Sequence, residues 1–174
     1  MNRIISSQRG FSMIEVLITL LLVSVGVLGM VAMQSRTVQY TQDSVQRNTA
    51  AMLANDLVEL MRASPNGAAE FYKEEATAFA AAPADCTVTT NVEAEQLSCW
   101  SQKAARLLPG VTAALLTSDF YICRSKVAGT CDDDEGSAVE IQLVWTVKQG
   151  QCMDATDPNA ATSTQCSYRL RTQL

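Results

Sequence analysis

The stretch "RGFSMIEVLITLLLVSVGVLGMVAM", residues 9–33, decides how the chain begins to fold. After Glu15 it contains only apolar, glycine, serine and threonine residues. A helix of this length crosses most of the hydrocarbon core of a bilayer. A secretory signal peptide would end such a run in a small-residue cleavage site, and none follows Met33. We therefore expect residues 11–33 to form a helix that is retained as a membrane anchor.

The charges flanking this run predict how the chain is oriented. Arg3 and Arg9 precede the run, and the rest of the chain is acidic, with 13 basic and 18 acidic residues in total. The positive-inside rule places such a leader in the cytoplasm and the following domain outside, in the bacterial periplasm or beyond. The net charge of −5 and the lack of clustered Lys and Arg argue against nucleic acid as a partner.

Two features of the composition bear on chemistry. The chain contains no histidine, which removes the commonest general base and the commonest metal ligand. We expect no enzyme activity and no cofactor. The six cysteines all follow the apolar run and form no C-x-x-C motif, so an even set of disulfides in an oxidising compartment is favoured over reduced core cysteines. They are Cys86, Cys99, Cys123, Cys131, Cys152 and Cys166.

The sequence Gly10-Phe11-Ser12-Met13-Ile14-Glu15 and the apolar run after it resemble the class III signal of type IV pilins and type II secretion pseudopilins. The resemblance implies that a prepilin peptidase removes residues 1–10 by cutting between Gly10 and Phe11. It also implies that Phe11 is then N-methylated and that Glu15 becomes the fifth residue of the mature chain. Many members of the family have a proline near position 32, where this chain has Ala32, so melting of the helix on assembly stays open.

Two interpretations of Glu15 follow. In the first, implied by the resemblance, its carboxylate pairs with the amino terminus of a neighbouring subunit and directs assembly, because a charge within a membrane usually has a partner. In the second, the carboxylate lies at the membrane interface, where the dipole at a helix N-terminus favours it. The leader motif favours assembly.

The polar region after the anchor predicts a helical spine. Residues 34–63 contain no Pro or Gly before the "SPNG" stop and carry an apolar stripe at helical spacing. A helix over residues 11–62 would be about 78 Å long. Beyond it, residues 64–174 form the disulfide-linked domain. We expect a short helix or connection over 68–82 and a second short helix over 93–108.

Alternation of apolar and polar residues predicts strands late in the chain, at 119–125, 138–149 and 167–174, with a weaker fourth at 87–92. Val139, Ile141, Leu143 and Trp145 share one face, and the last strand lies at an edge. The expected fold class is α+β and pilin-like: a long amino-terminal helix, anchor plus spine, packed on a small antiparallel sheet of three or four strands.

Six cysteines allow 15 connectivities. Nearest-neighbour pairing gives Cys86–Cys99, Cys123–Cys131 and Cys152–Cys166, each closing a short loop worth roughly 2–3 kcal/mol. Two acidic stretches invite a calcium interpretation, "CDDDEG" at 131–136 and "DATDPN" at 154–159. Adjacent carboxylates splay apart in a turn, whereas calcium loops place ligands at alternate positions, so we assign no metal site.

The segments "LLPG" and "VEIQLVWTV" and the paired cysteines resemble PilV-type minor pilins. This resemblance implies a low-copy pilus subunit that helps to initiate assembly in a tip or priming complex, with twitching motility and adhesion downstream. The implied partners are other minor pilins, the major pilin, the prepilin peptidase, the pilus assembly platform, the inner membrane and, as a further candidate, a tip adhesin. The alternatives are a minor pseudopilin of type II secretion and an adhesive, ligand-binding pilus subunit.

Overall fold

The computed structural model describes residues 10–64, 67–87, 92–131, 136–153 and 162–174. Its first element is a single helix, α1, which spans Met13–Ala63. An 18-residue window of α1 has a mean hydropathy of 2.7, so the helix is long and apolar enough to cross a membrane. The expected helix over residues 11–62 is confirmed apart from its first two residues. The described chain divides into two compact units, residues 1–39 and 40–174.

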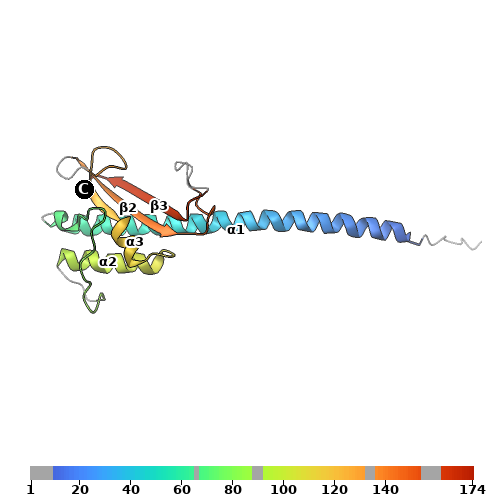
Figure 1. The fold of residues 1–174 in the computed structure, drawn as a ribbon, viewed down its shortest axis with the longest axis horizontal. Helices are drawn as coiled ribbons and strands as arrows, with labels where there is room; N and C mark the ends of the chain where they lie inside the picture. Colours follow the sequence, from blue (N-terminus) through green and yellow to red (C-terminus); the bar gives the residue numbers. More distant parts are fainter. Residues whose placement is uncertain (1–9, 65–66, 88–91, 132–135, 154–161) are drawn as a thin grey trace, which may run out of the picture. The chain divides into compact units, whose positions relative to one another are not determined.

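The second unit contains the carboxy-terminal part of α1, two further α-helices, a short 3-10 helix and one sheet (Figure 1). The sheet is antiparallel with the order β1-β2-β3, formed by β1 (Tyr121–Ser125), β2 (Ala138–Thr146) and β3 (Gln165–Thr172). The expected α+β class and edge position of the last strand are confirmed. The weaker fourth strand, at 87–92, lies largely outside the described residues.

One hydrophobic core joins α1 to the sheet. Leu53, Leu57 and Met61 of α1 are fully or almost fully buried, as are Ile141 and Trp145 of β2. They belong to a single cluster of buried residues. The predicted inner face of β2 is therefore the core face. Of the apolar stripe expected on the spine, Leu53 and Leu57 pack in this core, whereas Val38, Val45 and Met52 are exposed, and for these three the expectation is wrong.

Strand β2 is covered more completely than alternation alone implies. Eight of its nine residues are buried, including Glu140 and Gln142, which lie outside the hydrophobic core cluster. The strand was expected to be half-buried, and that expectation is wrong. The reason is local: the loop after β1 lies over Glu140 and donates hydrogen bonds to it.

Helix α2 (Glu93–Leu107) forms where it was expected. The indole Nε1 of Trp100 donates a hydrogen bond of 2.9 Å to the carbonyl of Leu53, which fixes α2 against α1. A further helix, α3 (Ala113–Ser118), was not expected; it begins after Thr112, whose hydroxyl accepts a hydrogen bond from the Leu115 amide.

Over residues 68–82, where a short helix or a connection was expected, the structure shows mostly a connection. Only the 3-10 helix η1 (Ala68–Phe71) forms, and residues 74–82 contain no regular element. The backbone of Lys73 instead pairs with Ile122 of β1, with N–H to O distances of 2.8 and 2.9 Å in the two directions. Pairing with the sheet edge has overridden the helix propensity of this alanine- and glutamate-rich segment.

Candidate functional site

The residues of the leader motif lie at the very start of α1. Gly10 and Phe11 precede the helix, and the carbonyl of Ser12 accepts hydrogen bonds from the Glu15 and Val16 amides at 3.0 and 3.3 Å. Phe11 is 84% exposed. A Cβ atom added to Gly10 would meet no heavy atom within 4 Å. The fold of this chain therefore does not require glycine at position 10, and the Gly10–Phe11 peptide bond is accessible.

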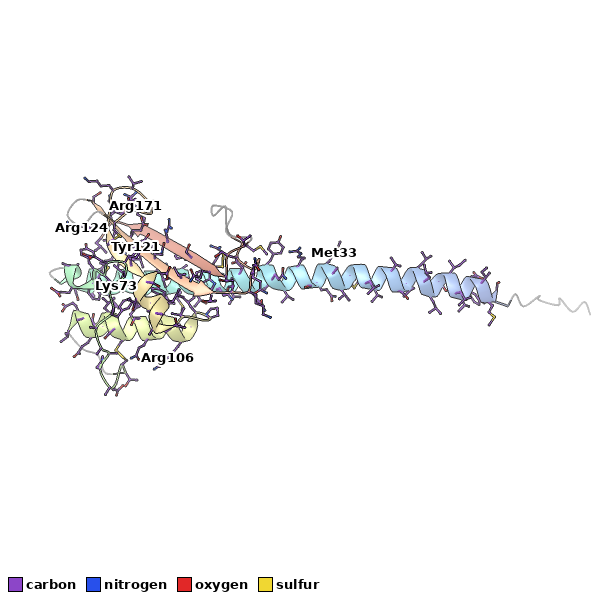
Figure 2. The ribbon with its side chains drawn as sticks, in the orientation of Figure 1. Met33, Lys73, Arg106, Tyr121, Arg124 and Arg171 are labelled. Carbon is purple, nitrogen blue, oxygen red and sulfur yellow. A yellow bond between two sulfur atoms is a disulfide. The ribbon has the colours of Figure 1, made fainter. Side chains whose placement is uncertain are left out.

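Glu15 lies in the first turn of α1 and is exposed. Within the described part of the chain its carboxylate has no ion-pair or side-chain hydrogen-bond partner. No charged residue follows it up to Met33, and the apolar side chains of this half of α1 project around the helix (Figure 2). The carboxylate is thus left available to a positive group from outside this chain.

A polar turn of α1 holds the base of the carboxy-terminal disulfide loop. Asp43, which is buried, accepts a hydrogen bond of 2.8 Å from Arg47 Nε and one of 3.4 Å from the amide of Met153. Arg47 also lies within 3.7 Å of the Cys152 sulfur and stacks over the ring of Trp145 at 5.9 Å. The spine thereby positions both ends of the segment that runs from Cys152 back into β3.

The same turn is the one described group of side chains spaced like metal ligands. A carboxylate oxygen of Asp43 and the sulfurs of Cys152 and Cys166 lie within 4.8 Å of one another. The two sulfurs are joined in a disulfide, however, and it is the thiolate that binds metals. The arrangement is therefore structural. The acidic residues 132–135 and 154–159, considered above for calcium, lie wholly outside the described residues.

Three disulfides bring the cysteines together, Cys86–Cys99, Cys123–Cys131 and Cys152–Cys166, with Cα separations of 5.5, 5.6 and 5.5 Å. All six cysteines are described, and none is free. The pairs are nearest neighbours in sequence. Each one closes a separate surface segment onto α2, β1 or β3.

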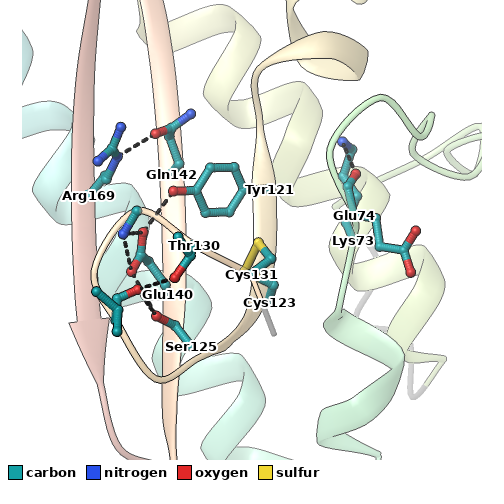
Figure 3. The surroundings of a disulfide bond; sticks show 12 residues. Lys73, Glu74, Tyr121, Cys123, Ser125, Thr130, Cys131, Glu140, Gln142 and Arg169 are labelled. Carbon is teal, nitrogen blue, oxygen red and sulfur yellow. Dashed lines mark hydrogen bonds between the residues drawn. A yellow bond between two sulfur atoms is a disulfide. The ribbon is translucent and has the colours of Figure 1, made fainter. Parts of the chain in front are cut away.

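A buried carboxylate organises the second of these segments. Glu140 is 1% exposed and accepts hydrogen bonds from the Tyr121 hydroxyl at 2.7 Å, the Ser125 hydroxyl at 3.2 Å and the Gly129 amide at 2.8 Å (Figure 3). Burial, followed by the bond to Glu140, raises the pKa of Tyr121 far above its ordinary value. The loop that Cys123–Cys131 closes is thus folded around one carboxylate.

A buried lysine organises the segment after η1. Lys73 Nζ donates hydrogen bonds to the carbonyls of Phe120, Glu74 and Thr117, at 2.6, 3.1 and 3.3 Å. The ammonium also lies 5.0 Å from the ring centroid of Phe79. Desolvation lowers the pKa of Lys73 to about 8. Its bonds are all to backbone carbonyls of this chain, so its role is to hold the irregular segment against α3 and β1.

Comparison with known proteins agrees with the amino-terminal geometry. A model of the prokaryotic N-terminal methylation motif matches residues 5–31, and a model described as type IV pilin Tt1218 matches residues 32–107. Together they cover more than half of the chain. The chain belongs to the type IV pilin superfamily. No curated protein and no solved structure matches it.

Membership of this superfamily agrees with the absence of catalytic architecture expected from the sequence. Pilins are structural subunits, and the matched family is not a family of enzymes. In this pilin, Gly10, Phe11 and Glu15 were identifiable from the sequence as the candidate assembly residues. The buried polar residues of the domain were not: Glu140 stands at an alternating position of a strand, and Lys73 stands in a segment that resembles an exposed helix.

Proposed function

We propose that this pilin is a minor subunit of a type IV pilus, present at low copy, that helps to initiate assembly in a tip or priming complex. The proposal rests on the family, on the PilV-type segments "LLPG" and "VEIQLVWTV", and on a domain whose three surface segments are each fixed by a disulfide. Segments that are each tied to the domain by a disulfide suit a subunit that selects particular neighbours. Its partners would be other minor pilins, the major pilin and a tip adhesin, with twitching motility and adhesion downstream.

Maturation in this proposal begins with removal of residues 1–10. A prepilin peptidase cuts between Gly10 and Phe11 and methylates the new amino terminus on Phe11. The exposure of Phe11 and the open space around Gly10 support this step, because the fold does not require a glycine at position 10. In this proposal the glycine is required by the prepilin peptidase, which recognises the cleavage site.

Glu15 is the assembly residue. The single observation that carries this role is an exposed carboxylate at the head of the otherwise uncharged, apolar first part of α1, up to Met33, with no partner among the described residues. A carboxylate within a bilayer costs up to about 3 kcal/mol at the centre and less near the interface. Pairing with the amino terminus of a neighbouring subunit removes that cost only in the filament. Glu15 therefore favours docking over the free, lipid-embedded state.

The membrane places the two ends of the protein in different compartments. Arg3 and Arg9 precede the apolar run, so the leader faces the cytoplasm by the positive-inside rule. The domain after residue 39 then lies in the periplasm until assembly moves it to the cell surface. Three disulfides in that domain agree with an oxidising compartment.

The first experiment is an in-frame deletion of the gene, with sheared surface pili and secreted exoproteins quantified from the same cultures. We expect loss of pili with secretion intact. Loss of secretion with normal pili would overturn the proposal and assign the protein to the pseudopilins of type II secretion.

Complementation then tests Glu15. We expect Glu15→Ala to be cleaved normally but to be missing from sheared pili. Ile14→Ala, at the neighbouring exposed position, should be cleaved and incorporated like the unmodified protein. Normal incorporation of Glu15→Ala would refute the role of the carboxylate.

A further inference from the structure

The two edges of the sheet differ. At the β1 edge, the backbone of Lys73 already pairs with Ile122 in both directions. At the other edge lies β3, which pairs with β2 on one side only. An eight-residue strand with one unpaired side presents a row of backbone donors and acceptors to any extended segment beside it.

The register identifies which backbone groups point outward. The amide of Val147 donates to the carbonyl of Thr164 at 2.8 Å, which continues the β2–β3 register by one pair beyond Thr146 and Gln165. In an antiparallel ladder, hydrogen-bonded pairs alternate. Cys166, Tyr168, Leu170 and Thr172 therefore bond towards β2. Gln165, Ser167, Arg169 and Arg171 turn their backbone groups to the free edge.

Part of this edge is already occupied. The Ser163 hydroxyl satisfies both backbone groups of Gln165, at 3.0 and 2.8 Å, and Arg47 Nη1 lies 3.5 Å from the carbonyl of Ser167. In the described part of the chain, no partner is present for the outward amides of Ser167, Arg169 and Arg171. The open edge therefore runs from Ser167 to Arg171.

The side chains along this open edge define what would fit beside it. Arg169 and Arg171 are exposed on the outer face of the sheet, where Arg169 Nε also donates to Gln142 and Arg171 Nη2 donates to the carbonyls of Ser125 and Lys126. Tyr168 and Leu170 are half-buried against the core on the inner face. A neighbouring strand would place its side chains directly opposite these residues, where opposite charges attract and apolar pairs pack. The complementary segment alternates acidic residues on the outer face with apolar residues on the inner face.

A second copy of β3 does not meet this description. Antiparallel pairing of two β3 edges would bring the arginines of both strands onto the same face, and like charges opposite one another destabilise a sheet. Arg169 and Arg171 thus oppose self-association and favour a different, acidic strand.

We propose that the open edge of β3 receives an extended segment of a neighbouring pilus subunit in which acidic and apolar residues alternate. The inference deepens the proposed function by assigning one docking surface to the domain. Backbone hydrogen bonds supply the attachment, and Arg169, Arg171, Tyr168 and Leu170 select the sequence.

Amide hydrogen exchange of the full chain in detergent micelles tests the proposal. The probe is a synthetic octapeptide that alternates glutamate and valine, and its control has lysine in place of glutamate. With the glutamate peptide at ten times its dissociation constant, we expect exchange at Ser167, Arg169 and Arg171 to slow about tenfold. The amides of Tyr168 and Leu170 already bond to β2 and should change little. Equal protection by the lysine peptide, or no protection by either, would overturn the proposal.

Three variants sharpen the test. Ser167→Pro removes one outward amide without removing a bond to β2, a substitution that edge strands tolerate, and it should abolish protection. Ser167→Ala, which keeps the amide, should behave as the unmodified chain. The double substitution Arg169→Glu with Arg171→Glu should reverse the preference to the lysine peptide, and an unchanged preference would refute the role of the arginines. Because these readouts need no filament, they are independent of whether the subunit acts in priming.

Discussion

The hydroxyl of Tyr121 donates a 2.7 Å hydrogen bond to Glu140, and both side chains are buried on the face of the sheet that points away from α1. The Gly129 amide donates to the same carboxylate from the loop closed by Cys123–Cys131. Gly129 has a φ of +85°, a backbone conformation that favours glycine. The Glu140 carboxylate thus links strand β1 to the loop that the Cys123–Cys131 disulfide closes.

Removal of that carboxylate should therefore destabilise the domain strongly. We expect Glu140→Ala to lower the free energy of unfolding by on the order of 3 kcal/mol, since it leaves the buried Tyr121 hydroxyl and the Gly129 amide without their acceptor. Denaturant titration of the full chain in micelles, followed by the fluorescence of the buried Trp100 and Trp145, measures the loss. Glu59→Ala, which removes an exposed ion pair with Arg62, is the control and should change stability little. Equal effects of the two substitutions would contradict this role of Glu140.

Lys73 makes stability depend on pH in the alkaline range. Desolvation lowers its pKa from 10.5 to about 8 in the folded chain. Between these values the unfolded chain binds more protons at this residue, so stability rises as the pH increases above about 8. Tyr121 acts in the opposite sense above its ordinary value of 10.0, because burial raises its folded pKa. Stability should therefore increase from pH 8 to 10.

Comparison with a variant isolates the contribution of Lys73 to this rise. Lys73→Met keeps most of the aliphatic side chain but cannot titrate, so its stability should be flat from pH 8 to 10. Lys103→Met is the matched control, because Lys103 is half exposed and pairs with Asp56 at the surface. If the slope persisted in Lys73→Met, another group would have to account for it.

The spine should control the carboxy-terminal loop through Asp43. Replacing Asp43 with Ala removes the acceptor of Arg47 Nε and of the Met153 amide. We expect the segment between Cys152 and Cys166 to become cleavable by protease at least several times faster, while the rest of the domain stays folded. Mass spectrometry of timed digests identifies the sites. Arg62→Ala, on the exposed face of the same helix, should leave the digestion pattern unchanged.

The sequence predicted those parts of the fold in which local pattern and tertiary environment agree. The apolar run up to Met33 predicted the first part of helix α1, and the alternation of Val139, Ile141, Leu143 and Trp145 predicted the core face of β2. These signals are periodic and extend over many residues. The same reasoning names Gly10 and Phe11 for processing and Glu15 for assembly, because the leader motif is a contiguous stretch of chain, and these roles stay predictions.

The remaining features depend on partners that are distant in sequence. Lys73 is held by the carbonyl of Phe120, 47 residues away, and its backbone pairs with Ile122, so the segment is a connection rather than the alternative short helix. Glu140 is buried because the loop after β1 returns over it, although its position in β2 predicts exposure. Such contacts cannot be predicted from composition or periodicity. The burial of Lys73 and Glu140 therefore could not be predicted from their local segments.

The last prediction concerns the cleavage site, where the fold makes no demand. A Cβ at Gly10 meets nothing within 4 Å, so Gly10→Ala should leave the domain as stable as before. If the peptidase reads this glycine, however, the variant should accumulate with residues 1–10 attached. Mass spectrometry of membrane-extracted protein distinguishes the intact chain from one that begins at N-methylated Phe11. Gly26→Ala, which also adds a Cβ in open space, should be cleaved normally. An unmodified Met1 terminus in the parent protein, or a cut after Met33, would contradict the proposed processing.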